Sequence, residues 1–252
     1  MRKKPVALIC SLAALALLTA GCQPKGAAGT PPTGGSGDTA SSSAGGNGQG
    51  SSEATVQVPE SLKHDAFRYI GFDHKKPLKY SYVKLQGTAP EEGSQTCVIK
   101  SADKDAADVL VERDGSLKEL GTEEFQVKPD GIYLVSTQQG KPDKPVMQMP
   151  AKLPVGTVWD YKFPLTGKSG EKMTLTGKAK VEAVEKVKVE AGEFDTIRVT
   201  ETATLDFNGK PSTVSMKTWY AKDVGIVKMK MEMKNEKGDI VTSTMELSGT
   251  GD

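Results

Sequence analysis

The sequence predicts an all-β protein, an antiparallel and strongly curved sheet or open barrel preceded by a short N-terminal helix. From Pro77 onward, apolar and polar residues alternate with the period of two that is typical of half-buried strands. No helical period is sustained over ten residues in this part of the chain. Polar outer faces on about ten or eleven strands indicate a sheet solvated on one side, and such a sheet must curl to bury its other face.

The predicted strands follow one another with short turns between them. In chain order they span residues 78–86, 95–101, 107–112, 117–127, 131–137, 157–163, 172–191, 194–207, 214–220, 227–233 and 241–247. Asn208-Gly209 predicts a tight hairpin because both residues tolerate a positive φ, and Asn235 to Gly238 predicts a second turn. Turns are also expected at Asp114-Gly115 and Asp130-Gly131.

Two irregularities stand out in this pattern. The alternation changes phase at Ala183-Val184, which predicts a β-bulge or a bend. Glu201 is the lone charged residue on the apolar face of segment 194–207. Ahead of the strands, Ser61 to Ile70 has an apolar stripe at helical spacing, so we expect a short helix there with Ser61 as its N-cap.

The N-terminus has the organisation of an export signal. Arg2, Lys3 and Lys4 precede an apolar run over 5–18, which is shorter than the roughly 20 residues of a membrane-spanning helix. The run ends in Leu17-Leu18-Thr19-Ala20-Gly21-Cys22, which resembles the lipobox of bacterial lipoproteins, although Thr19 stands where Leu is more usual.

The lipobox resemblance implies that Cys22 becomes the acylated N-terminus (palmitate and diacylglycerol) and anchors the protein to the outer face of a membrane. Gln23 after the cysteine is similar to the class sorted to the outer membrane in Gram-negative bacteria; in a Gram-positive host the plasma membrane is expected. The alternative is an ordinary signal peptide, cut near Ala20, that leaves Cys22 as a free thiol.

Composition divides the chain into three parts. Residues 1–21 form the signal peptide, and residues 22–58 form a tether rich in Gly, Ser, Thr and Pro that cannot bury enough apolar surface to fold. Residues 59–252 form the β-domain, which divides near residue 150 into two halves with faint similarity. The similarity pairs 128–135 with 221–227, and 77–82 with 157–162, so either an internal duplication or ordinary strand patterning explains it.

A second resemblance covers roughly residues 150–234. Segments 153–161 (LPVGTVWDY), 189–197 (VEAGEFDTI) and 218–227 (TWYAKDVGIV) follow one another in an order similar to exported bacterial β-rich proteins and lipoproteins of unknown function. The resemblance implies an antiparallel sheet bent into an open barrel, somewhat like periplasmic lipoprotein carriers. It brings no catalytic residues.

Charge gives no indication of a nucleic-acid partner. The chain has 33 Lys and Arg against 32 Asp and Glu, a net charge of +1, whereas nucleic-acid binding usually requires a basic domain or stripe. Removal of Arg2, Lys3 and Lys4 with the signal leaves 30 basic against 32 acidic residues, a net charge of −2.

Candidate catalytic and metal-binding residues are sparse. His64 and His74 are the only histidines and are expected to be exposed near Asp65 and Asp73; they lack the converging ligands of a zinc site. Cys97 is expected to be a buried strand residue. The cluster Asp103, Asp105 and Asp108 lacks the glycine and terminal glutamate of an EF-hand and predicts a solvated turn. We therefore expect no metal, no cofactor and no enzymatic activity.

Five methionines share the inward faces of three consecutive predicted strands: Met216, Met229, Met231, Met233 and Met245. Flexible thioethers either fill the core of a curved sheet or line an adaptable cavity for a hydrophobic ligand. The sequence thus favours a membrane-anchored envelope lipoprotein with a non-catalytic binding or structural module, whose partner is a protein or a hydrophobic ligand. The alternative is a carrier that encloses a lipid, and an enzyme with an unrecognised carboxylate pair is a third hypothesis.

Overall fold

The structure is a computed structural model that describes residues 56–138, 140–166, 172–234 and 238–251. The predicted signal peptide, the acylation site at Cys22 and nearly all of the predicted tether lie outside the described residues, as does most of the turn at 235–238. The β-domain that follows is one compact unit. No helix among the described residues is long and apolar enough to cross a membrane.

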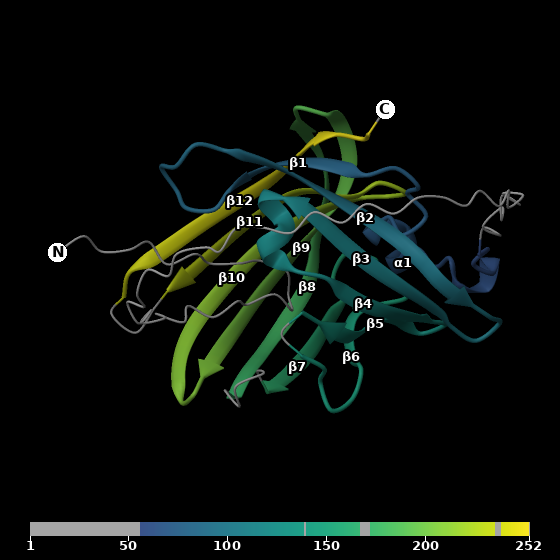
Figure 1. Cartoon of the computed structure of the whole chain (residues 1–252), viewed down its shortest axis with the longest axis horizontal. Coiled ribbons are helices and arrows are strands. Elements are labelled where there is room, and N and C mark those ends of the chain that lie inside the picture. Colours follow the sequence, from purple (N-terminus) through teal and green to yellow (C-terminus); the bar gives the residue numbers. More distant parts are fainter. Residues whose placement is uncertain (1–55, 139, 167–171, 235–237, 252) are drawn as a thin grey trace, which may run out of the picture. The chain divides into compact units, whose positions relative to one another are not determined.

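Within the described residues, twelve antiparallel strands form one sheet that curls into a nearly closed barrel (Figure 1), as predicted. The strands are β1 (Leu78–Val83), β2 (Glu91–Ala102), β3 (Ala107–Gly115), β4 (Glu123–Lys128), β5 (Gly131–Thr137), β6 (Val146–Pro150), β7 (Val158–Thr166), β8 (Lys172–Val189), β9 (Gly192–Phe207), β10 (Lys210–Ala221), β11 (Gly225–Lys234) and β12 (Ile240–Gly249). Three short helices accompany them: η1 (Glu60–Leu62), α1 (Asp65–Ile70) and η2 (Ser116–Leu120).

The strand order in the sheet is nearly the order of the chain. β1 to β6 form one meander and β7 to β12 form another, and the two are joined by the pairing of β1 with β12. β6 and β7 are the two ends of the sheet, and Figure 1 shows them next to each other. We call this junction, where no ladder of backbone hydrogen bonds joins the neighbouring strands, the seam.

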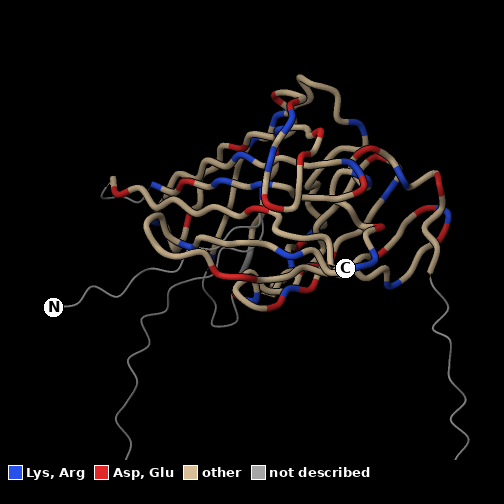
Figure 2. Tube along the Cα trace, turned by 90° about the horizontal axis from the view of Figure 1, so that it is seen from above, with Lys and Arg blue, Asp and Glu red and all other residues tan. Residues whose placement is uncertain are grey.

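The alternation that predicted the strands produces the observed burial. On β11, Val227, Met229, Met231 and Met233 are buried, and the lysines and the glutamate between them lie on the outer face. The exposed charges carry both signs, and Figure 2 shows them interspersed along the trace. The curl of the sheet brings its apolar face inward, so the core lies between the walls of the barrel.

The predicted turn and bulge are confirmed. Asn208 and Gly209, with φ of 50° and 81°, join β9 to β10 in a two-residue hairpin loop. The β8–β9 register shifts between Val181 and Ala183, next to the predicted break at Ala183-Val184. Such a bulge increases the local twist and helps a strand as long as β8 to follow the curve of the barrel.

Three predictions about elements were wrong. Residues 117–127 are not one strand, because the chain makes the 3₁₀ helix η2 before β4 begins at Glu123. β6 was missed because its five residues do not alternate clearly. The predicted helix 61–70 is divided into η1 and α1, and Ser61 does not cap it.

The N-cap of α1 is His64, which is half-buried and was expected to be exposed. Its Nδ1 accepts a hydrogen bond from the Phe67 backbone N–H at 3.3 Å, so the neutral ring donates from Nε2 to the Lys128 carbonyl at 3.0 Å. Burial lowers the pKa of His64, although the bond to the Lys128 carbonyl acts in the opposite direction. The histidine thereby ties α1 to the β4–β5 turn.

The other end of α1 is tied to the β10–β11 turn. The Arg68 guanidinium pairs with Asp223, and the Asp223 backbone N–H donates to the Arg68 carbonyl at 2.7 Å. A Cβ on Gly71, the C-cap with φ of 77°, would lie 2.3 Å from the Val224 carbonyl oxygen, so only glycine allows this approach. Segment 218–227, one of the three segments on which the second resemblance rests, thus includes the turn that contacts α1.

Six of the described strands lie on each side of the connection 151–157, which coincides with the division near residue 150 predicted from the sequence. The similar segments 128–135 and 221–227 both span the turn between the fourth and fifth strands of their half. Segments 77–82 and 157–162 both cover the start of the first strand of their half. Their common origin stays a prediction, but their positions in the fold correspond.

Candidate functional site

The five methionines lie where the sequence placed them, on the inner face of β10, β11 and β12. Each is at most 8% exposed, and they belong to one cluster of buried apolar side chains. Met216 lies opposite Met231 in the β10–β11 pair, and Met229 lies opposite Met245 in the β11–β12 pair. This side of the barrel interior is therefore rich in flexible thioethers.

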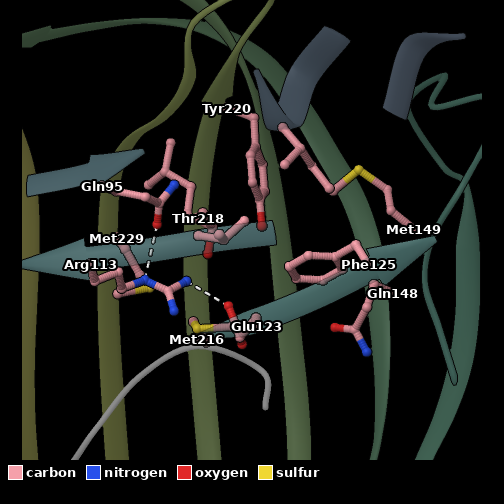
Figure 3. Close-up of a pocket in the computed structure, with 13 residues that line it drawn as sticks. Gln95, Arg113, Glu123, Phe125, Gln148, Met149, Met216, Thr218, Tyr220 and Met229 are labelled. Atoms are coloured by element: carbon pink, nitrogen blue, oxygen red, sulfur yellow. Dashed lines mark hydrogen bonds and ion pairs between the residues drawn. The ribbon is translucent and has the colours of Figure 1, made fainter. Parts of the chain in front are cut away.

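A cavity of about 80 Å³ lies between the two walls of the barrel (Figure 3). One wall, from β2, β3, β4 and β6, carries the polar groups Gln95, Arg113, Glu123 and Gln148. The opposite wall, from β10 and β11, presents mainly Met216, Thr218, Tyr220 and Met229. The remaining lining is apolar and includes Ile70 of α1: Ile70, Val111, Phe125, Met149 and Ile226.

The cavity brings together two of the five predicted methionines. Met216 and Met229 line it, whereas Met231, Met233 and Met245 are not among the residues that surround it. Those three side chains are buried in the same apolar cluster. Whether any of the five contacts a ligand stays a prediction.

Arg113 and Glu123 form a buried ion pair on the wall of the cavity. Their side chains are 5% and 3% exposed, and Arg113 Nη2 donates to Glu123 Oε2 at 2.5 Å. Arg113 Nε also donates to Gln95 Oε1 at 3.0 Å and Nη1 to the Gly121 carbonyl at 3.0 Å. These bonds satisfy charges that would otherwise be very costly to bury.

Thr218 is the polar residue of the facing wall that lacks a partner. It is 1% exposed, and its hydroxyl makes no hydrogen bond within the described part of the chain. Figure 3 shows Thr218 among the residues that face Arg113 across the cavity. An unsatisfied buried hydroxyl costs about 1–3 kcal/mol, so its retention calls for an explanation.

Glu201 is buried beside this site but does not line it. It is 3% exposed on β9, between Ala179 on β8 and Met216 on β10, so the inward position predicted from the alternation is confirmed. Burial raises the pKa of Glu201 to about 8, and the nearby Tyr161 hydroxyl opposes this only in part. Neither carboxylate oxygen has a hydrogen-bond partner of normal geometry among the described residues, so the side chain is protonated at neutral pH.

A second hollow of about 270 Å³ lies on the outer face, between the β1–β2 loop and strands β11 and β12. Its lining is polar except for Val83: Val83, Gln86, Gly87, Lys230, Glu232, Thr242 and Thr244. The two charged groups neutralise each other, because Lys230 pairs with Glu232 at 2.7 Å. This surface therefore has neither an apolar lining nor a net charge.

The other residues that were considered from the sequence as candidates for catalysis or metal binding are Cys97, His74 and the aspartates near Asp103. Cys97 lies half-buried on β2, and burial raises the pKa of its thiol to about 12, so it is not a reactive thiolate. Asp103 accepts backbone N–H bonds from Asp105 and Ala106, as expected of a turn. His74 bonds to the Lys76 carbonyl. Among the described residues, no group of three or more His, Cys, Asp or Glu side chains is arranged to hold a metal ion.

Arg113, Glu123 and Thr218 were not predicted from the sequence as residues of one site. A signal was present for the two charged residues, because Arg113 follows buried Val109 and Val111 in phase, and Glu123 precedes Val127 in phase. A charged residue on the inward phase of a strand indicates a buried partner. Which residues pair across the barrel, however, depends on its curvature and not on local pattern.

Comparison with known proteins supports the fold. The family model described as DUF3108-like matches residues 146–247, which is less than half of the chain. An exported protein from Bacteroides fragilis with a YmcC-like fold aligns at 13% identity and TM-score 0.50, over 70% of this chain and 95% of that protein. A lipoprotein from Parabacteroides distasonis aligns at 12% identity and TM-score 0.51, over 72% of this chain and 97% of that protein.

These identities are low enough that the likeness concerns the fold alone. The lipoprotein YmcC of Escherichia coli aligns at 10% identity and TM-score 0.31, over 71% of this chain and 89% of that protein, and we draw no conclusion from it. No curated protein matches the chain. The chain is therefore similar over residues 146–247 to the DUF3108-like family, and in fold to exported proteins and lipoproteins with a barrel-like sheet.

Proposed function

We propose that the chain is a lipid-anchored protein of a bacterial cell envelope, with a non-catalytic β-domain that acts as a binding or structural module. The observation that carries the anchor is the basic, then apolar N-terminus that ends in Leu-Thr-Ala-Gly-Cys at Cys22. The likeness in fold to an exported protein and to a lipoprotein supports the same location. Several acyl chains at about 0.8 kcal/mol per buried CH₂ would hold such a protein on a bilayer.

The volume of the interior cavity favours a module over a lipid carrier. Ligand pockets usually enclose about 300–1,000 Å³, and the cavity between the walls holds about 80 Å³. Buried side chains from both meanders, including the methionines, fill the space around it. This small volume supports a filled interior and not an acyl-binding space beside the methionines.

The residues of the cavity favour binding over catalysis. Its ionisable side chains are Arg113, Glu123 and Tyr220, and the two charged ones are bound to each other. A general acid or base must be free to exchange a proton with a substrate. Partners of the module are then a protein or a small ligand, and the anchor provides the contact with the membrane.

The anchor is tested with the full chain expressed in a bacterial host that is fed an alkyne analogue of palmitate. We expect the wild-type protein to carry the label and to sediment with membranes: the outer membrane in a Gram-negative host and the plasma membrane in a Gram-positive host. Cys22→Ala should lose the label and become soluble, whereas Cys97→Ala should keep both. A labelled or membrane-bound Cys22→Ala protein would refute the anchor.

The choice between module and carrier is tested on the full-length Cys22→Ala protein, purified without detergent. Native mass spectrometry should give the mass of the polypeptide alone. A stoichiometric adduct of a lipid that dissociates on denaturation would show that the barrel opens to enclose a hydrophobic cargo, in favour of the carrier.

A further inference from the structure

We propose that the cavity between Arg113 and Thr218 is a binding site for a small, uncharged amide or alcohol with one polar and one methyl-bearing side. This inference rests on the proposed role of the domain as a binding module and names the ligand class for it. Three features of the cavity define that class: an unpartnered hydroxyl, a balanced pair of charges, and a small volume.

The unpartnered hydroxyl belongs to Thr218. Of the buried side-chain groups without hydrogen bonds in the described residues, those of Tyr80, Arg198, Glu201 and Ser243 do not line the cavity, whereas that of Thr218 does. A hydroxyl can both donate and accept, so a ligand with a carbonyl, an amide N–H or a hydroxyl would satisfy it. Binding would thereby remove a cost that the free protein bears.

The balanced charges argue for an uncharged ligand. Arg113 and Glu123 neutralise each other at 2.5 Å, and no other charged side chain of the described residues lines the cavity. An ion that entered would lose part of its hydration without gaining a counter-charge, which is unfavourable at a site lined by buried side chains. A neutral polar molecule escapes this penalty.

The volume of the cavity and its apolar lining define the size and shape of the ligand. A cavity of about 80 Å³ is roughly half the 150 Å³ that holds benzene in an engineered protein, so we expect about three to five non-hydrogen atoms. Met216, Met229 and Phe125 provide an apolar surface beside Thr218, which suits a methyl group. Met149 and Ile70 extend that surface on the remaining sides.

Acetamide and acetate have nearly the same shape and differ in charge, so they test the inference directly. We would titrate each into the full-length Cys22→Ala protein carrying ¹³C-methyl methionine, with the methyl signals assigned by single Met→Leu substitutions. Acetamide should cause saturable shifts at Met149, Met216 and Met229, which line the cavity, and not at Met173 or Met233, which do not. Acetate should bind at least tenfold more weakly.

Thr218→Val keeps the shape of the side chain and removes the hydroxyl. It should weaken acetamide binding roughly fivefold to tenfold, as expected for the loss of one hydrogen bond. Ser243→Ala is the matched control, because it removes another buried, unpartnered hydroxyl that lies outside the cavity, and it should leave the affinity within about twofold. Both variants remove an unsatisfied group and should fold at least as stably as the parent.

Four results would overturn the inference. They are the absence of a saturable shift at the three cavity methionines up to about 100 mM acetamide, equal shifts at Met173 and Met233, equal binding of acetate, and equal effects of the two variants. The first result would mean that the cavity accommodates water only. Each result is distinct from a failure of the proposed anchor, which is read from the location of the Cys22→Ala protein and not from acetamide.

Discussion

Trp159 on β7 donates its indole N–H to the carbonyl of Gln148 on β6 at 2.9 Å, across the seam where the two ends of the sheet meet. Both residues are 8% exposed, so the bond is shielded from water. No ladder of backbone hydrogen bonds joins β6 to β7, so this side-chain hydrogen bond links the two strands instead. Trp159 lies in segment 153–161, one of the three segments on which the second resemblance rests, and the bond gives this residue a structural role.

Trp159→Phe should therefore weaken the seam specifically. The Gln148 carbonyl would remain buried without its donor, at a cost of about 1–3 kcal/mol in the free energy of unfolding. Hydrogen exchange should become faster in β6 and β7 but not in β9 and β10. Urea denaturation and exchange mass spectrometry measure the two effects.

Trp219→Phe is the control for this experiment. It also removes an indole donor, in this case to Glu185 on the outer face, but it lies away from the seam. It should leave exchange in β6 and β7 unchanged. Equal acceleration of exchange at the seam in both variants would mean that Trp159 has no special role there.

Glu201 should make stability fall as pH rises. Burial raises its pKa from 4.5 to about 8, so between these values the folded protein holds a proton that the unfolded chain has lost. The contribution of this bound proton to the free energy of unfolding is complete below pH 4.5 and is lost by about pH 8. Between these values the free energy of unfolding falls by up to roughly 1.4 kcal/mol per pH unit. Urea denaturation at pH 5, 6.5 and 8 measures the slope.

Glu201→Gln removes the titrating group and should flatten this dependence, which makes the variant more stable than the wild type at pH 8. Glu182→Gln is the control: Glu182 is exposed on β8, and Lys180 lowers its pKa, so it does not titrate in this range. If the wild type and Glu201→Gln lose stability with the same slope, Glu201 is not the cause.

Removal of one partner of the Arg113–Glu123 pair should lower the free energy of unfolding strongly, whereas replacement of both by apolar residues should lower it little. Arg113→Met leaves a buried carboxylate without its partner, and we expect a loss of about 3–5 kcal/mol in the free energy of unfolding. Arg113→Met with Glu123→Leu should recover most of that loss. A double-mutant cycle from chemical denaturation gives the coupling.

The exposed pair Lys84–Glu119, at 2.7 Å, provides the comparison, and Lys84→Met should cost less than about 1 kcal/mol. A double variant at Arg113 and Glu123 that is no more stable than the single one would show that the pair itself, and not its burial, holds these strands together.

Gly71 should tolerate no side chain. Gly71→Ala combines a positive φ with a clash against the Val224 carbonyl, and we expect a loss above about 3 kcal/mol together with release of α1. Gly87→Ala has a similar φ of 90° but meets no atom within 4 Å, so about 1–2 kcal/mol is expected. Thermal denaturation and limited proteolysis near α1 compare them, and equal losses would exclude the clash.

Local pattern predicted the strands well because one face of the sheet is buried along most of its length. The alternation on β11, the hairpin at Asn208-Gly209 and the bulge near Ala183 each follow from a few neighbouring residues. β6 and η2 were missed for the same reason, because neither has a clear local period. His64 was misjudged because its partner, the Lys128 carbonyl, lies 64 residues away.

The candidate site could not be predicted from the alternation of apolar and polar residues along each strand. The alternation places Met216 and Thr218 on the inner face, but it does not say that Arg113 and Glu123 lie across from them. That neighbourhood arises from the closure of the barrel, which brings β3 and β4 to face β10 and β11. Cavity volume likewise depends on the fit between side chains of distant strands.

The pairing of β1 with β12 has a consequence for how the protein folds. Within the described residues, every other pairing of the sheet joins strands that are consecutive in the chain. Each six-stranded meander can therefore form through short loop closures, and the joining of β1 to β12 is the single long-range step. A chain cut within 151–157 would leave two fragments for which β1–β12 is the one strand pairing to re-form, so the rate of their association reports on this long-range step.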